Sequence, residues 1–337
     1  ISAGAGIVVS QQFGAREGEK LSKTIGNCIF LTLISTAFIM SVATLVTRPL
    51  LQLLKTPDSI IDWCSSYLHI LFIGSGGLAF FNILGGILRG LGDSVSALLY
   101  LIIASILNIV LDLLFVVEFN MGVSGVALAT VIAQAVSGIL CLIKLMRKTD
   151  IFTLKLEHIK PIKKYVVNII RLGLPSGITQ VIMAMAMIVV QSLTNSYGEM
   201  FIAANVIVMR VDGFAMMPNF SFGNAMTTYA GQNVGAERFD RVETGAKQGT
   251  QMAVGISLFI TIIILIAGKP LMGIFTNTSE LVDLGMQMMR ILAVGYIAMA
   301  IMQSLSGVMR GAGDTMTPMW ISLLTTIAIR VPLAYGI

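Results

Sequence analysis

Long stretches without any charged side chain run through this sequence, and they limit its fold more than any other feature. The charge-free stretches are 24–47, 63–88, 94–111, 119–143, 172–198, 213–236, 248–268 and 291–309. Most of them reach the length of about 20 residues that a helix needs to cross about 30 Å of hydrocarbon. A surface helix of a soluble protein would instead carry polar residues along one face. The sequence therefore predicts an all-α polytopic membrane protein.

Composition and loop charge agree with this fold class. Charged residues make up 12% of the chain, against about 25% in soluble domains. We predict spans at 24–47, 62–88, 94–117, 122–143, 165–195, 201–230, 248–268, 283–309 and 316–337, and the tail of another at 1–12. Alternate loops hold most of the basic residues, and the opposite loops hold only Arg48, Lys55 and Lys269. This asymmetry predicts a multi-pass protein with cytoplasmic basic loops. The basic residues behind the net charge of +5 therefore set the orientation of the chain in the membrane. They do not indicate a nucleic-acid partner.

An internal repeat divides the chain. Gln11–Ala15 recurs as Gln232–Ala236, Arg48–Leu50 as Lys269–Leu271, and Arg89–Ser94 as Arg310–Thr315. Positions 11 and 232, 48 and 269, and 89 and 310 are each 221 residues apart. Three matches at one spacing, each at the same place relative to a span, predict two homologous halves.

The repeat also predicts the domain organisation. We expect an amino-terminal lobe at 1–147, a cytoplasmic linker at 148–164 and a carboxy-terminal lobe at 165–337. The chain begins and ends inside apolar stretches, so we expect truncation at both ends. The first helix and part of the second would be missing from one lobe, and the last helix from the other. Restoring them gives two six-helix lobes, with about ten of twelve helices represented here. Transporters with parallel repeats bind substrate between their halves.

The repeated segments carry a resemblance to a known family. Gly231–Ala236, Arg171–Pro175 and the two Arg-Gly-x-Gly-Asp turns together resemble the multidrug and toxic compound extrusion (MATE) family over the whole chain. The resemblance implies a monomeric transporter of the bacterial inner membrane, with twelve helices in two lobes. It implies export of amphipathic, often cationic compounds across the lipid bilayer, driven by entry of protons or sodium ions. No cofactor besides the coupling ion is expected.

The glycine-rich turns also have a structural interpretation. Gly92 and Gly313 suit tight turns, and Asp93 and Asp314 are placed to cap the helices that follow, at about 1 kcal/mol each. The pairs Gly86/Gly90 and Gly307/Gly311 form small-xxx-small faces that allow close helix packing.

Asp112 is the first candidate for cation coupling, because a carboxylate inside the bilayer costs at least about 2.5 kcal/mol and needs a function to retain it. It lies one helical turn after Asn108, so the two side chains share a face. Their oxygens suit either Na⁺ or a proton. The resemblance implies that this Asn-x-x-x-Asp pair belongs to an amino-lobe cation site, with Asn82 and Thr130 at matching positions and an Asp in the absent first helix. The alternative is an Asp112 solvated near the outer interface.

Asp212 is the second candidate, for substrate binding or coupling. Residues 210–214 resemble a carboxylate-bearing motif of bacterial MATE proteins; the alternative is an ion pair of Asp212 with Arg290 or Arg330. Gln180 and Asn205 place polar atoms on neighbouring helices, where they line a cleft or bond between helices. Another branch of the family has a Glu where this chain has Met183, which disfavours that carboxy-lobe site. The thioether of Met183 suits varied ligands, although methionines often face lipid.

The sequence gives less support to three other functions. A flippase for lipid-linked precursors would need a basic central cavity, for which the chain offers only Arg210, Arg290 and Arg330. An enzyme is poorly supported, because the sequence contains no His-Glu-x-x-His, Gly-x-Ser-x-Gly or P-loop motif. The two-lobe repeat and single acids favour a transporter over a channel.

Overall fold

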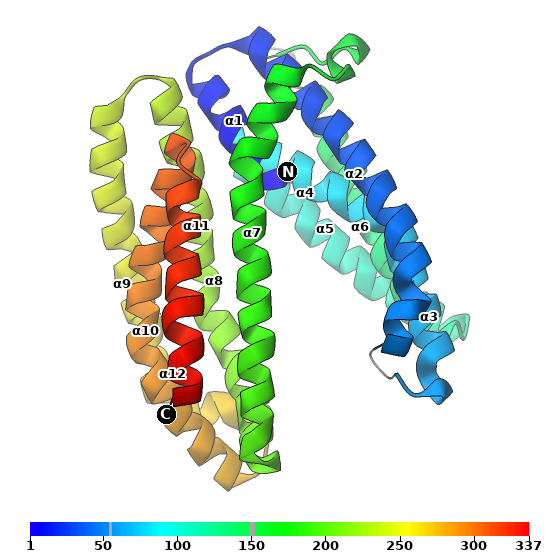
Figure 1. Cartoon of the computed structure of the whole chain (residues 1–337), viewed down its shortest axis with the longest axis vertical. Helices are drawn as coiled ribbons and strands as arrows, with labels where there is room; N and C mark the ends of the chain where they lie inside the picture. The colour runs from blue at the N-terminus through cyan, green and yellow to red at the C-terminus, as the bar shows by residue number, and fades with distance from the viewer. Residues whose placement is uncertain (54–55, 148–151, 337) are drawn as a thin grey trace. The chain divides into compact units, whose positions relative to one another are not determined.

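The computed structural model describes residues 1–53, 56–147 and 152–336, and every regular element in these ranges is a helix (Figure 1). In chain order the helices are α1 (Ser2–Gly14), α2 (Gly18–Leu53), α3 (Asp58–Ile73), α4 (Ser75–Gly90), α5 (Ser94–Leu113), the π-helical η1 (Leu114–Glu118), α6 (Gly122–Met146), the 3₁₀ turn η2 (Leu156–Ile159), α7 (Lys163–Thr194), the 3₁₀ turn η3 (Asn195–Tyr197), α8 (Glu199–Gly235), α9 (Phe239–Gly273), α10 (Ser279–Ala312), α11 (Met316–Leu323), the π-helical η4 (Leu324–Arg330) and α12 (Val331–Gly336).

The predicted all-α polytopic fold is confirmed. In the described ranges, eight helices are long and apolar enough to cross a membrane, or nine if the bent pair α3 and α4 is one span. The short α1 corresponds to the predicted tail at 1–12. Large apolar side chains also point outward, as with Ile266 and Val294, which are each 80% exposed. Such exposure suits lipid, since helices in a bilayer satisfy their own backbone groups and need not hide apolar side chains.

Packing divides the chain into two compact units, Ile1–Gly173 and Leu174–Ile337, with the division inside α7. The core of the first unit gathers around Leu84, Ile87 and Leu88 of α4. The core of the second gathers around Met272 of α9 and Tyr296 of α10. The lobe boundaries at 147 and 165 were drawn from the repeat rather than from packing, and they stay a prediction.

The predicted span at 62–88 is two helices, α3 and α4, which meet at an angle of 42°. The bend lies at Gly74, where an added Cβ would come within 2.1 Å of the Val131 side chain on α6. In the second unit, α10 runs unbroken through the repeat counterpart Gly295, where nothing lies within 4 Å of an added Cβ. Close packing of α6 against Gly74 therefore accompanies the bend in the first unit, whereas Gly295 has no such neighbour among the described residues.

The turns repeat at the predicted spacing of 221 residues. Arg16 and Glu237 both adopt a φ of 56°, and Gly92 and Gly313 have φ values of 82° and 99°. Glycine adopts this left-handed backbone without steric cost, which explains the glycines at positions 92 and 313.

The predicted caps are confirmed. Asp93 Oδ1 accepts a hydrogen bond from the Ser96 N–H at 3.1 Å, and Asp314 Oδ1 accepts one from the Thr317 N–H at 3.0 Å. Hydrogen bonds from Thr317 lower the pKa of the Asp314 carboxyl below its usual value.

Part of the predicted linker packs on the first unit, while residues 148–151 lie outside the described ranges. The Thr153 N–H donates to Ser22 Oγ at 3.2 Å, and the Ile162 N–H donates to Asn27 Oδ1 at 2.8 Å. Gly26 allows the approach, because an added Cβ there would lie 2.1 Å from the His158 carbonyl oxygen. The segment 152–162 is therefore tied to α2.

Candidate functional site

Two of the predicted amino-lobe residues meet between α5 and α6. The Asn108 amide nitrogen donates a long hydrogen bond of 3.4 Å to Thr130 Oγ1. Thr130 in turn donates to the Val126 carbonyl of its own helix at 3.0 Å. The hydroxyl hydrogen of Thr130 and one amide hydrogen of Asn108 are therefore engaged, which leaves Asn108 Oδ1 available as an oxygen ligand.

Asp112 follows Asn108 by one turn of α5. Its Oδ1 atom is shielded from solvent and has no hydrogen-bond partner in the described part of the chain. A buried polar atom left without a partner costs about 1–3 kcal/mol, and more if it is charged. Asp112 as a whole is half-buried, so a solvated Asp112 remains the alternative to the cation site. Either a bound cation or a proton on the carboxylate would relieve the cost.

Asn82 is placed differently. Its amide nitrogen donates to the Leu78 carbonyl one turn back on α4, at 2.9 Å, and the residue is exposed. Within the described ranges no hydrogen bond joins Asn82 to Asp112, Asn108 or Thr130. Its membership of the cation site stays a prediction.

Gln134 is a further polar residue near this site that sequence reasoning missed. It lies one turn after Thr130 on α6, and its Oε1 atom is buried without a hydrogen-bond partner in the described ranges. Residues four apart on a helix share a face, so Gln134 directs a second unpaired oxygen to the face of α6 that carries Thr130. The sequence signal that could have identified Gln134 is its spacing of four residues from Thr130.

In the second unit, Asp212 of α8 pairs with Tyr296 of α10. The Tyr296 hydroxyl donates to Asp212 Oδ1 at 2.9 Å, and Tyr296 itself is only 1% exposed. Asn219, two turns after Asp212, donates from its amide to the Tyr296 carbonyl at 3.3 Å, while its Oδ1 is buried without a partner in the described ranges. No ion pair of the described residues joins Asp212 to Arg290 or Arg330. The partner of the Asp212 carboxyl is therefore the Tyr296 phenol and not the guanidinium of Arg290 or Arg330.

The other carboxy-lobe candidates make no hydrogen bond to Asp212 in the described ranges. Gln180 on α7 is exposed. Asn205 directs its amide to Met209 Sδ on its own helix at 3.7 Å, and Met183 Sδ accepts from Thr326 Oγ1 of η4 at 3.6 Å. Met183 therefore joins α7 to η4. The substrate roles of all three residues stay predictions.

Comparison with known proteins decides the family. A model of the MatE family matches residues 1–114 and 175–336. The protein belongs to the MATE family of efflux transporters. This MATE protein is 26% identical to the probable multidrug resistance protein YoeA of Bacillus subtilis over 346 residues, covering 99% of this chain and 74% of the relative. It is 29% identical to the probable multidrug resistance protein YpnP of the same species, covering 96% of this chain and 73% of the relative.

A solved structure, "Crystal structure of MATE in complex with MaL6", is also similar, with a TM-score of 0.93 and 25% identity, covering 99% of this MATE chain and 76% of that one. The helix arrangement described above is therefore that of MATE transporters. The protein is a multi-pass membrane transporter of this family.

The Asp212–Tyr296 contact makes a testable prediction for this MATE protein. Tyr296→Phe is expected to lower the free energy of unfolding in detergent by about 1–2 kcal/mol, because it removes the hydroxyl that donates to Asp212. Asp212→Asn is expected to lower it by about 1 kcal/mol, because the amide oxygen accepts only a weaker, neutral hydrogen bond. The double variant is expected to lose less than the two single losses added together. Tyr197→Phe, which alters an exposed tyrosine, should change stability by less than about 0.5 kcal/mol. Additive losses in the double variant would show that the pair is not coupled.

Proposed function

We propose that this MATE protein is a secondary active antiporter that exports amphipathic or cationic drugs and toxins in exchange for protons or sodium ions by alternating access. One observation carries the proposal: Asp112 presents a buried carboxylate oxygen with no partner in the described ranges, beside the bonded pair Asn108 and Thr130. Both relatives cited above are named as probable multidrug resistance proteins, which supports drugs as the exported class.

The proposed coupling site consists of Asp112, Asn108, Asn82 and Thr130. For sodium, Asp112 and Asn108 supply a carboxylate and an amide oxygen, which are hard ligands of the kind that alkali and alkaline-earth cations prefer. For a proton, Asp112 alone is the acceptor, and its unpaired oxygen is the atom that would be protonated. In either case, loading neutralises a buried charge, and unloading restores it. This difference favours one conformation of the lobe when loaded and another when empty.

A second carboxylate, Asp212, is the proposed substrate or coupling residue of the other unit, with Gln180, Asn205 and Met183 as accessory candidates. The Tyr296 hydroxyl donates to Asp212 Oδ1 and so fixes the position of the carboxyl group. A carboxyl group at this place would attract a cationic substrate. Since the phenol occupies only Oδ1, Oδ2 remains for the ligand.

We further propose that the protein works as a monomer in the bacterial inner membrane, with its basic loops in the cytoplasm. The placement of lysine and arginine in alternate loops supports this orientation. The flippase alternative is not favoured, because the family match and the names of the relatives support multidrug efflux.

The test is efflux of a fluorescent cation such as ethidium from loaded cells or inverted vesicles, with proton and sodium gradients imposed separately. Dye movement that follows one gradient supports the antiporter and identifies the coupling ion. Dye retention under both gradients, with the protein present in the membrane, would contradict the multidrug proposal. It would favour the alternative function, a flippase for lipid-linked precursors.

A further inference from the structure

A polar cavity of about 530 Å³ lies where α8 ends and α9 begins. It is lined by Tyr229, Gln232, Asn233, Asp240, Arg241 and Thr244. The two proposed carboxylate sites use none of these residues. The cavity lies at the end of two membrane-spanning helices, where the chain leaves the apolar part of the bilayer.

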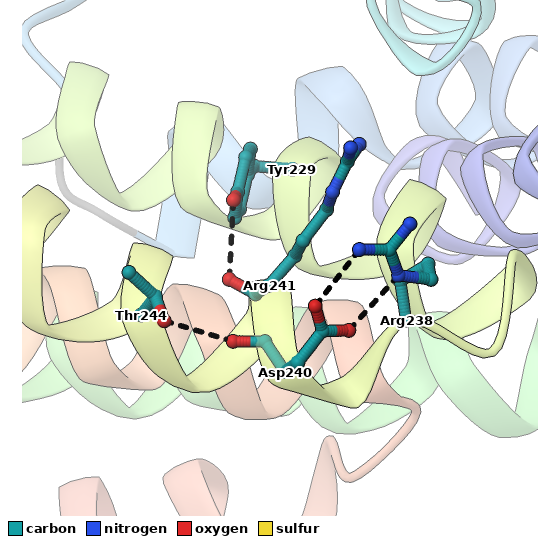
Figure 2. A network of polar contacts seen from close by, with 5 residues as sticks. All are labelled: Tyr229, Arg238, Asp240, Arg241 and Thr244. Carbon is teal, nitrogen blue, oxygen red and sulfur yellow. Dashed lines mark hydrogen bonds and ion pairs between the residues drawn. The ribbon is translucent and has the colours of Figure 1, made fainter.

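One wall of the cavity is a fixed tyrosine ring. Tyr229 lies against α9 at Gly245, where an added Cβ would be 2.1 Å from the ring. The Tyr229 hydroxyl donates to the Arg241 backbone carbonyl at 3.1 Å, as Figure 2 shows. The ring is therefore held by its contact with Gly245 and by the hydrogen bond of its hydroxyl. In the other repeat, the position of Tyr229 is taken by Val8, which is 2% exposed and belongs to the core.

The charges of the cavity do not cancel. Arg238 binds the Asp240 carboxylate through two hydrogen bonds of 3.0 and 2.9 Å, which neutralises the acid in the lining. The Arg241 side chain points away from Asp240 in Figure 2. Its guanidinium makes no hydrogen bond or ion pair within the part of the chain that the structure describes. The lining is left with one positive charge and the donors of a planar guanidinium.

Two lysines of the equivalent turn in the first unit are ion-paired. Position 20 corresponds to 241, and Lys20 forms an ion pair with Glu17 at 2.6 Å. Lys23 of the same turn pairs with Glu19 at 2.5 Å. At 238, the position equivalent to Glu17, the second unit has an arginine. At this position the two turns therefore differ: Lys20 is paired in the first unit, whereas the Arg241 guanidinium makes no ion pair among the described residues of the second.

We propose that this cavity binds a phosphate group, with Arg241 as its main ligand. A guanidinium matches two phosphate oxygens with parallel N–H donors. The Asn233 amide nitrogen gives one hydrogen to the Tyr229 carbonyl at 2.8 Å and keeps another for the ligand. At the end of two membrane spans the phosphate comes from a lipid headgroup or from free phosphate in solution. Basic pockets at this depth bind headgroups, and tyrosine favours the same interface.

The test is native mass spectrometry of the purified protein titrated with phosphatidylglycerol, with a phosphate-free diacylglycerol and with inorganic phosphate. Wild type is expected to bind phosphatidylglycerol, and Arg241→Gln to bind it about tenfold more weakly, since a charge-assisted hydrogen-bonded contact is lost. Arg241→Lys should recover part of the affinity, and Lys20→Gln, the counterpart in the other turn, should leave it unchanged.

Binding of inorganic phosphate alone, lost in Arg241→Gln, would support the site and identify the free ion as its ligand. Equal binding of diacylglycerol and phosphatidylglycerol, or equal binding by wild type and Arg241→Gln, would overturn the proposal. Arg241 is exposed, and unchanged thermal unfolding of Arg241→Gln confirms that the variant is folded.

Discussion

Asp112→Asn is expected to abolish gradient-driven dye export while leaving the protein folded. The carboxylate is the one acid of the Asp112–Asn108–Thr130 cluster, and its Oδ1 has no partner in the described ranges. An asparagine cannot take up the coupling proton, and it offers sodium a neutral oxygen instead of a charged one. The loss of about 3 kcal/mol of cation binding corresponds to an affinity about 100-fold lower. Export rates in inverted vesicles under each gradient measure the effect.

Stability gives this experiment its internal check. Replacing a carboxylate whose Oδ1 is shielded and has no partner in the described ranges is expected to leave the free energy of unfolding unchanged or to raise it. Thermal unfolding of Asp112→Asn in detergent measures this, and an unchanged midpoint shows that a loss of transport does not come from misfolding. The matched control is Asp283→Asn, which removes a carboxylate paired with Lys269 at 2.6 Å on an exposed surface, and which should transport normally. If Asp112→Asn transports like wild type, coupling through this residue is excluded and Asp212 becomes the next candidate.

Gly307→Ala is expected to destabilise the protein severely, by about 3 kcal/mol or more, the upper end of the range for overpacked sites. The added Cβ would lie 2.3 Å from the Gly223 carbonyl oxygen and 3.1 Å from the Met226 Cβ atom. The nearest obstacle is backbone, so no change of side-chain conformation can relieve it, and α8 and α10 must move apart. Thermal unfolding in detergent and the yield of monodisperse protein measure the loss.

Gly295→Ala is the matched control, because it makes the same change on the same helix. Nothing lies within 4 Å of an added Cβ at Gly295, and alanine is the better helix former by about 0.5–1 kcal/mol. This variant is expected to be as stable as wild type or more so. Equal stability of Gly307→Ala and Gly295→Ala would show that the close packing of α8 and α10 does not depend on the glycine.

Close helix contact at the two glycine pairs was predicted from sequence and is confirmed. Gly86 lies near Ser2, and Gly90 near Gly6 and Val9; Gly307 and Gly311 meet the backbone of α8. The signal was local, since residues four apart fall on one helix face, and glycines there leave a groove for a neighbouring backbone. Which helix would fill the groove could not be read from this spacing.

The cation site was predictable in part. Asn108 and Asp112 share a face by spacing alone, and the resemblance to MATE proteins supplied Thr130, which contacts Asn108. Gln134 and Tyr296 were missed, since a glutamine or a tyrosine in an apolar span usually packs without further function. Only the neighbouring helix shows that Tyr296 faces Asp212 across 84 residues of sequence.

By itself, the sequence determined which segments are helical, which turns repeat, and which residues cap the helices that follow. These features depend on the polarity and conformational preference of residues within a few positions of one another. The tertiary structure alone decided the bend at Gly74, the phenol that pairs with Asp212, the missing partner of the Asp112 oxygen and the free guanidinium of Arg241. Each of these depends on what a distant helix or a neighbouring turn places beside the side chain. Such contacts are set by the packing of whole helices, which local sequence does not encode.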